Sequence, residues 1–227
     1  MAHAVRTTAK AGALLGAAAA GAWAALLPRV LKWGATDDEA VRPLPGDQLV
    51  DNPMYVTTRA ITIAAPAAAI WPWLVQIGQN RGGFYTYDAL ENLAGLNVRS
   101  ADRVHPEWQD LRAGVDYLSL DPGETMKMTI AVLEPSRAFV VRSGAPGEPP
   151  QEAGSLFRGE MAWTWGFYLE PAGPAETRLI VRSRARWRRT VPAAFARAFG
   201  LEPVHFFMEE GMLRGIRGRA ERAAADD

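Results

Sequence analysis

Alternation of apolar and polar residues over the second half of the chain is the feature that most constrains its fold. The segments VDYLSL, MKMTIAVLE, AFVVRS, MAWTWGFYLE and TRLIVRSRARW alternate in this way, and turn-forming stretches such as EPSR and EPAGPAE separate them. A period of two places every second side chain on one face of a β-strand. Because the connections are short, neighbouring strands are expected to pair antiparallel in one sheet.

Helical patterns flank this strand region. The residues from Val204 onward contain no proline and predict one long helix with an apolar stripe. Ahead of the sheet, residues 57–63 (TTRAITI) predict a further strand, and APAAAIWPWLVQIGQ and YDALENLAG predict two short helices. This order favours an α+β fold, in which a curved antiparallel sheet surrounds the long C-terminal helix and the short helices close the gap between its ends.

The N-terminus is a separate apolar segment, residues 1–33. Arg6 and Lys10 precede an uncharged run at 11–27, AGALLGAAAAGAWAALL, which is near the lower limit of about 17 residues for a membrane span. The AWA motif also fits a signal-peptide cleavage site. An uncleaved membrane anchor, a cleaved signal peptide and a surface helix stay open as alternatives, and we expect a membrane-associated or exported protein rather than a cytoplasmic one.

The remaining chain divides into a linker at 34–56, a globular domain at 57–223 and a tail at 224–227. The linker carries three prolines and the acidic run DDE, with one helical turn expected after Thr36.

The composition excludes several classes of function. Lys plus Arg and Asp plus Glu each number 25, so no net charge attracts the molecule to nucleic acid. The absence of cysteine excludes disulfides and thiol nucleophiles. The histidines at positions 3, 105 and 205 are too scattered to predict a metal site, and no Walker loop, GxGxxG or HExxH motif is present. We therefore expect no cofactor and no metal.

Several stretches together resemble the START-like or SRPBCC superfamily, which includes polyketide cyclase/dehydrase-like proteins, and a bacterial subgroup of it in particular. These stretches are WGATDDE with PLPGD, TTRAITIAAP, IWPWLVQIG, RGGFYTYDALEN, SADRVHPEWQDL and EPVHFFMEEGMLRGI. The resemblance to the superfamily as a whole lies in the order of the elements over roughly residues 57–223, and the quoted stretches carry the likeness to the subgroup. It implies the helix-grip fold and a deep, mainly apolar pocket between the sheet and the last helix. The superfamily includes lipid carriers, hormone receptors and cyclases, so the shared fold does not assign a function.

Aromatic and methionine side chains are the candidate walls of that pocket. In MAWTWGFYLE the large apolar residues fall on one face by alternation. A solid core is the alternative for any one of them, but Met side chains also suit loosely shaped ligands. The expected ligand contacts are Trp73, Phe84, Tyr85, Tyr87, Met128, Trp163, Trp165, Phe167, Phe207, Met208 and Met212.

The stretch RGGFYTYDALEN, at the joint between the two short helices, has two interpretations. It is either a bend whose aromatics form a wall beside the pocket, with Asp88 capping a helix, or a polar clamp at the pocket mouth. For an enzyme, the weak catalytic candidates are Asp88, Glu91, His105 and Tyr85. Histidine is a common proton-transfer residue, but no nucleophile is recognisably paired with His105. We favour the bend.

Five arginines of the last strand lie at even positions and so share one face: Arg178, Arg182, Arg184, Arg186 and Arg188. We expect that face to lie in water, and contact with lipid phosphates is the alternative.

The sequence therefore predicts a protein that binds a small hydrophobic ligand, such as a lipid or polyketide-like molecule. Transport of that ligand is an optional further role. A cyclase- or dehydratase-type enzyme acting in the same pocket is the alternative, and an interaction module without a pocket is the second alternative.

Overall fold

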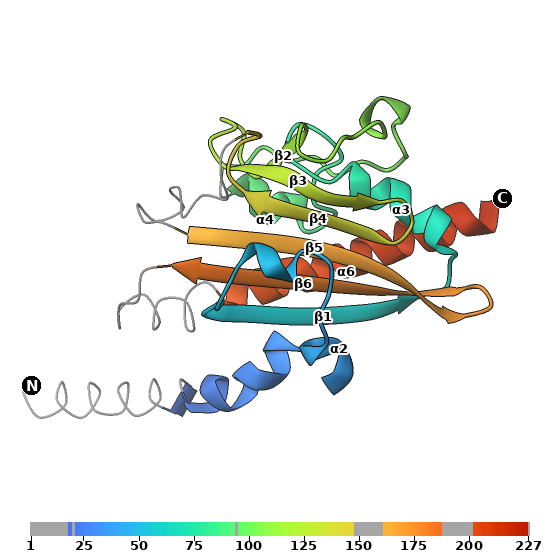
Figure 1. Cartoon of the computed structure of the whole chain (residues 1–227). Helices are drawn as coiled ribbons and strands as arrows, with labels where there is room; N and C mark the ends of the chain where they lie inside the picture. The colour runs from blue at the N-terminus through green and yellow to red at the C-terminus, as the bar shows by residue number, and fades with distance from the viewer. Residues whose placement is uncertain (1–17, 20, 94, 148–160, 188–201, 227) are drawn as a thin grey trace, which may run out of the picture.

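The computed structural model describes residues 18–19, 21–93, 95–147, 161–187 and 202–226. A helix at residues 21–31 is followed by elements whose order Figure 1 shows. These are α2 (Asp37–Val41), η1 (Asp47–Leu49), β1 (Tyr55–Ile63), α3 (Ala67–Val75), α4 (Asp88–Leu93), η2 (Pro106–Trp108), β2 (Tyr117–Ser119), β3 (Lys127–Glu134), β4 (Ala138–Ser143), β5 (Met161–Gly173), β6 (Glu176–Trp187) and α6 (Glu202–Asp226).

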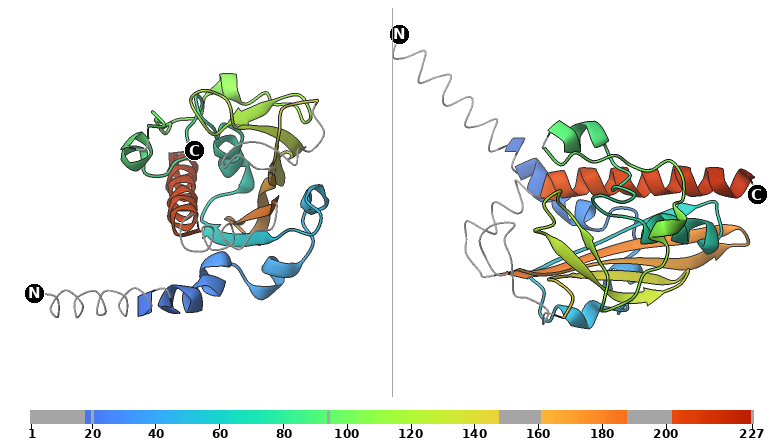
Figure 2. Two further views of the ribbon diagram at one scale, coloured as in Figure 1. Left: turned by 90° about the vertical axis from the view of Figure 1, so that its left-hand side faces the viewer. Right: turned by 90° about the horizontal axis from the view of Figure 1, so that it is seen from above.

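The strands form one six-stranded sheet in the order β1-β6-β5-β4-β3-β2. Every neighbouring pair is antiparallel. β1 therefore joins the sheet beside β6, far from it in sequence, while the other strands follow one another. Helix α6 lies along one face of this sheet (Figure 2). The expected α+β helix-grip arrangement is confirmed.

The main core lies between the sheet and α6. Alternate residues of β1, β5 and β6 point toward the helix, and the apolar stripe of α6 packs against them. Its central members are fully buried, as in Phe167, Val181 and Ile216, each 0% exposed. Burial of this apolar surface is the main force that holds α6 against the sheet.

Residues 34–50, called here the outer segment, fold back over the opposite face of the sheet. Leu44 packs there against Val140, Tyr168 and Ile180 in a second, smaller core. Thr36 begins α2 with a capping box: its side chain accepts from the Glu39 N–H at 3.1 Å, and Glu39 accepts from the Thr36 N–H at 2.7 Å. The helical turn expected after Thr36 is therefore confirmed.

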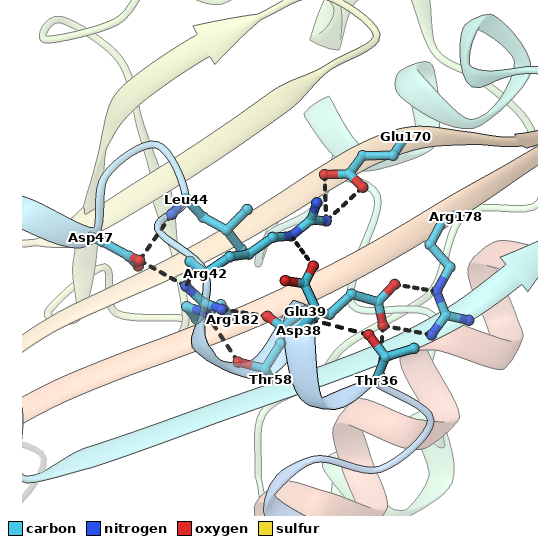
Figure 3. A network of polar contacts seen from close by, with 10 residues as sticks. All are labelled: Thr36, Asp38, Glu39, Arg42, Leu44, Asp47, Thr58, Glu170, Arg178 and Arg182. Atoms are coloured by element: carbon cyan, nitrogen blue, oxygen red, sulfur yellow. Dashed lines mark hydrogen bonds and ion pairs between the residues drawn. The ribbon is translucent and has the colours of Figure 1, made fainter.

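Arginines of β6 hold the outer segment in place (Figure 3). The Arg178 Nε lies 2.7 Å from Glu39 Oε1, and Arg182 Nη1 lies 2.7 Å from Asp47 Oδ2. The expectation that these arginines face water was wrong for Arg182, whose side chain is 2% exposed. The reason is the outer segment itself, because the acids of the expected linker return over this face and occupy the donors that a lipid phosphate would need.

Within the described part of the chain, no helix is long and apolar enough to cross a bilayer. Residues 11–17 and 20 of the apolar run at 11–27 lie outside the described residues, so the role of the run stays a prediction. Past the helix at 21–31, Trp33 makes an edge-on contact with Phe206 of α6, with ring centroids 6.2 Å apart.

Candidate ligand-binding site

An aromatic ladder on β5 runs along the face that α6 covers. Trp163 and Trp165 stack with centroids 6.2 Å apart, and Trp165 meets Phe167 at 4.7 Å. Exposure falls along the ladder: Trp163 is partly buried, Trp165 is 7% exposed and Phe167 is 0% exposed. The ladder thus leads from a partly open end of the site into the packed core.

A buried polar cluster joins β1 to the first turns of α6 beside this ladder. The guanidinium of Arg59, fully buried, forms ion pairs with Glu202 and with Glu209, the latter at 2.6 Å. The Tyr55 hydroxyl donates to Glu202 and lies 3.0 Å from Nδ1 of His205. Arg59 of β1 thus pairs with both carboxylates of α6.

The electrostatics of the cluster follow from its burial and its ion pairs. Burial alone would lower the pKa of Arg59, but the charges of Glu209 and Glu202 outweigh that effect and raise the pKa. Burial, and then the adjacent Glu202 charge, raises the pKa of Tyr55. Arg59 is therefore charged and Tyr55 neutral at physiological pH, so Tyr55 acts as a hydrogen-bond donor.

The ladder and the cluster are directly connected. Nε1 of Trp165 donates to Oε1 of Glu209 at 3.0 Å. Arg59 also donates from Nε to the Val30 carbonyl at 3.0 Å, which ties the helix at 21–31 to the same point. One end of the site is therefore aromatic and the other is charged, which is the usual composition of a ligand pocket with a few orienting polar groups.

The stretch RGGFYTYDALEN packs against α6 where that helix carries glycines. A Cβ on Gly215 would lie 2.0 Å from the Tyr85 carbonyl oxygen, and one on Gly211 would lie 2.7 Å from the Tyr87 ring. Tyr87 in turn stacks on Phe207 at 4.5 Å. The close approach explains the two glycines, and it makes this stretch a wall against α6.

Among the expected ligand contacts, most are buried in the main core. Tyr87 and Phe207 are exposed, by 37% and 45%, and Trp163 and Met208 are intermediate. The buried ones are Trp73, Phe84, Tyr85, Met128, Trp165, Phe167 and Met212. The structure therefore brings most of the predicted residues into the main core between the sheet and α6.

Three of the catalytic candidates have structural roles. Asp88 accepts from both the N–H and the hydroxyl of Ser100, at 2.8 and 2.6 Å. The Tyr85 hydroxyl donates to the Trp73 carbonyl at 3.0 Å, and burial raises its pKa. His105 lies 3.0 Å from Glu107 and stacks on Trp108.

Glu91 differs from the other candidates. Its side chain is buried, with the residue 4% exposed. Oε1 accepts from the Thr86 hydroxyl at 2.8 Å, while Oε2 has no hydrogen-bond partner among the described residues. Burial raises the pKa of Glu91. Of the four candidates, it is the carboxylate suited to donate or accept a proton.

A pocket of about 520 Å³ lies on the opposite face of the sheet, between the outer segment and the β4 and β5 ends. Its walls include Leu44, Tyr168 and the ion pair of Arg42 with Glu170, whose atoms approach to 2.6 Å. This pocket is separate from the expected one. A ligand-sized cavity beneath α6 stays a prediction. No cluster of three or more potential metal ligands occurs in the part of the chain described.

Sequence reasoning missed Tyr55, Arg59, Glu202 and Glu209. A signal was present, because Glu202, His205 and Glu209 recur at helical spacing on one face of α6. Tyr55 and Arg59 likewise occupy alternate positions of β1. The sequence does not reveal that these two faces meet, since 150 residues separate Arg59 from Glu209.

No family model and no curated protein matches this chain. Similar solved structures include the Zhui aromatase/cyclase from Streptomyces sp. R1128, with 19% identity and a TM-score of 0.40 over 74% of this chain and 94% of that one. A START superfamily protein from Mycobacterium smegmatis has 12% identity and a TM-score of 0.40, over 74% and 97%. A truncated norcoclaurine synthase from Thalictrum flavum has 13% identity and a TM-score of 0.39, over 70% and 91%. Similarity at this level carries no inference about ligand or reaction. START-like proteins, which the sequence resembles, are thus among the solved structures similar to this chain.

Proposed function

We propose that the protein binds a small apolar molecule between the aromatic ladder of β5 and helix α6. The observation that carries this proposal is the graded exposure of the ladder. Trp163 leaves part of its ring uncovered, directly above a stacked and nearly buried Trp165. Covering exposed apolar surface is favourable by about 25 cal/mol per Å², so a flat apolar ligand on Trp163 replaces solvent at that end.

Entry is proposed beside the stacked pair of Tyr87 and Phe207. Leu90 follows one turn after Tyr87 on α4, and Val204 precedes Phe207 by one turn on α6. These two are 47% and 61% exposed. An apolar rim of this kind provides a first contact for an apolar molecule that leaves water or a lipid phase.

Native mass spectrometry of the purified full chain tests the proposal. We expect a co-purifying apolar compound, or else displacement-sensitive binding of a fluorescent fatty-acid probe. Repeated solvent extracts without any such compound, together with no response of the probe, contradict the proposal. An interaction module without a pocket is then the remaining interpretation.

A cyclase- or dehydratase-type enzyme is the second candidate, and Glu91 is the observation in its favour. A buried carboxyl with a raised pKa and one unpartnered oxygen is suited to general acid catalysis. A structure with bound ligand tests this alternative: Glu91 must then lie within hydrogen-bonding distance of the ligand.

A further inference from the structure

Two buried hydroxyl groups lie on the face of the sheet that α6 covers. Thr57 of β1 and Ser183 of β6 face each other directly in the strand register, and both are 0% exposed. Neither hydroxyl oxygen has a hydrogen-bond partner among the residues that the structure describes. An unsatisfied buried hydroxyl costs about 1–3 kcal/mol, so two adjacent ones indicate that something else binds them.

The hydroxyls lie under the charged side of α6. Tyr55, Thr57 and Arg59 share one face of β1, and Tyr55 and Arg59 both reach the carboxylate of Glu202. Glu202 is therefore placed over Thr57, which lies between them in the strand.

The position of the Ser183 hydroxyl follows from the pairing of β6 with its neighbour β5. Ser183 pairs with Trp165 of β5, and the indole of Trp165 donates to Glu209. Thr57 and Ser183 thus lie on the sheet face whose neighbouring residues hold the carboxylates of α6, and Ser183 adjoins the aromatic ladder at Trp165.

The charges around the hydroxyls are not balanced. Among the described residues, the two buried carboxylates of Glu202 and Glu209 pair with one guanidinium, that of Arg59. His205 lies between them, with ring nitrogens 4.0 and 3.6 Å from the two carboxylates. The remaining polar contacts come from the Tyr55 hydroxyl and the Trp165 indole. The start of α6 partly stabilises Glu202, but Glu209 lies two turns further on, beyond that effect.

The hydrogen-bonding groups of this cluster, like its charges, favour a ligand that donates hydrogen bonds. From the residues that the structure describes, each carboxylate oxygen of Glu202 and Glu209 accepts one hydrogen bond, donated by Arg59, Tyr55 or Trp165. An ionised carboxylate offers about four acceptor sites, so acceptors are in excess. The two free hydroxyls add further acceptors. The group therefore suits a donor-rich cationic head and repels an anionic one.

We infer that Thr57, Ser183 and the adjacent carboxylates bind the head of the ligand, and that this head is a protonated primary amine on an apolar body. The inference rests on the proposed function. An ammonium group has three donors and no acceptor, which matches two hydroxyls and a carboxylate. The apolar body then lies along Trp165 and Trp163.

Isothermal titration of the full chain at pH 7 with octylamine, octan-1-ol and octanoate tests the head separately from the body. We expect octylamine to bind about tenfold or more tighter than octanol, as charge-assisted hydrogen bonds allow, and octanoate to bind weakest. Octanol or octanoate binding as tightly as octylamine overturns the inference while the proposed function stands. Binding of none of the three overturns the proposed function.

Isosteric variants test whether the hydroxyls take part. We expect Thr57→Val and Ser183→Ala each to keep or raise the stability of the free protein, since each removes an unsatisfied group. Each is also expected to weaken octylamine binding severalfold. Thr62→Val is the matched control, because Thr62 lies on the opposite face of the same strand, where it pairs with Arg178. Unchanged octylamine affinity in both variants means that the hydroxyls hold only buried water, and it overturns the inference.

Discussion

Arg59 of β1 and Glu209 of α6 form a buried ion pair, with Nη1 2.6 Å from Oε2, although 150 residues separate them in the chain. Their side chains are 0% and 1% exposed. The pair fixes the start of the long helix over the first strand, at the edge of the aromatic ladder. A buried pair of this kind adds little net stability compared with apolar residues, but losing one partner is costly because the other charge stays buried.

Replacing Arg59 by Met is therefore expected to destabilise the protein by about 3–5 kcal/mol, since two buried carboxylates lose their cation. The measurement is the free energy of unfolding in urea. Arg214→Met is the matched control, because Arg214 pairs with Glu210 on the surface of the same helix and is 60% exposed. The control should change stability by less than about 1 kcal/mol. Equal losses in the two variants contradict a special role for Arg59.

Two glycines of α6 should respond in opposite directions to the same substitution. Gly215→Ala places a Cβ 2.0 Å from the Tyr85 carbonyl oxygen, and we expect a loss of about 1–3 kcal/mol as the stretch moves away. Gly218→Ala meets only the end of the Arg222 side chain, at 3.4 Å. It should stabilise the helix by about 0.5–1 kcal/mol. Thermal melting of the two variants measures this, and a stable Gly215→Ala protein would show that the contact is loose.

Glu39 should make stability depend on pH in the acid range. The hydrogen bond from Arg178, which outweighs the effect of burial, lowers the pKa of Glu39 from 4.5 to about 2. A carboxylate with a lowered folded-state pKa stabilises the protein above pH 4.5 and loses that effect as the pH falls toward 2. The shift corresponds to at most about 3 kcal/mol.

We therefore expect Glu39→Gln to lower the free energy of unfolding at pH 7 and to flatten its decline between pH 4.5 and 2. Urea unfolding at several pH values measures both effects. Asp38→Asn is the control on the same helix, because its side chain is 77% exposed and its ion pair with Arg42 is screened by water. If the free energy of unfolding of Glu39→Gln declined between pH 4.5 and 2 as steeply as that of the wild type, the outer segment would be released before Glu39 protonates.

Trp163→Ala should weaken binding of an apolar fluorescent probe about tenfold, because it removes the partly exposed end of the ladder. Titration of the probe into the wild type and the variant measures the change. Arg184→Ala provides a control on the opposite face of the sheet, where it should leave the affinity unchanged. An unchanged affinity in Trp163→Ala would place the ligand elsewhere, such as in the pocket beside Leu44.

The N-terminal apolar run, which lies partly outside the described residues, gives a further prediction. We expect a tagged full chain to sediment with membranes and to resist carbonate extraction, because the run at 11–27 reaches the lower length for a span. A version beginning near Trp33 should stay soluble. A fully soluble full chain of unprocessed mass contradicts the anchor.

Local patterns predicted much of the fold. Alternation identified β5 and β6 and placed Trp163, Trp165 and Phe167 on the face that α6 covers. The proline-free C-terminal region predicted α6, and the capping signal after Thr36 predicted α2. The interpretation of RGGFYTYDALEN as a bend also agrees with the structure, since the glycines of α6 receive Tyr85 and Tyr87. These features depend on neighbours in sequence or on a single repeating period. The helix cap expected of Asp88 was wrong, because its carboxylate accepts from Ser100, which tertiary packing brings to it.

The sequence by itself determined the strand faces, the helix stripe and the order of elements, because these follow from the period of the apolar residues. Only the tertiary structure decided which polar residues meet. Arg182 is buried because the outer segment returns over β6, and Arg59 is paired because β1 lies beside β6 beneath α6. Long-range pairing of charges depends on how the elements pack, and no local spacing in the chain records it.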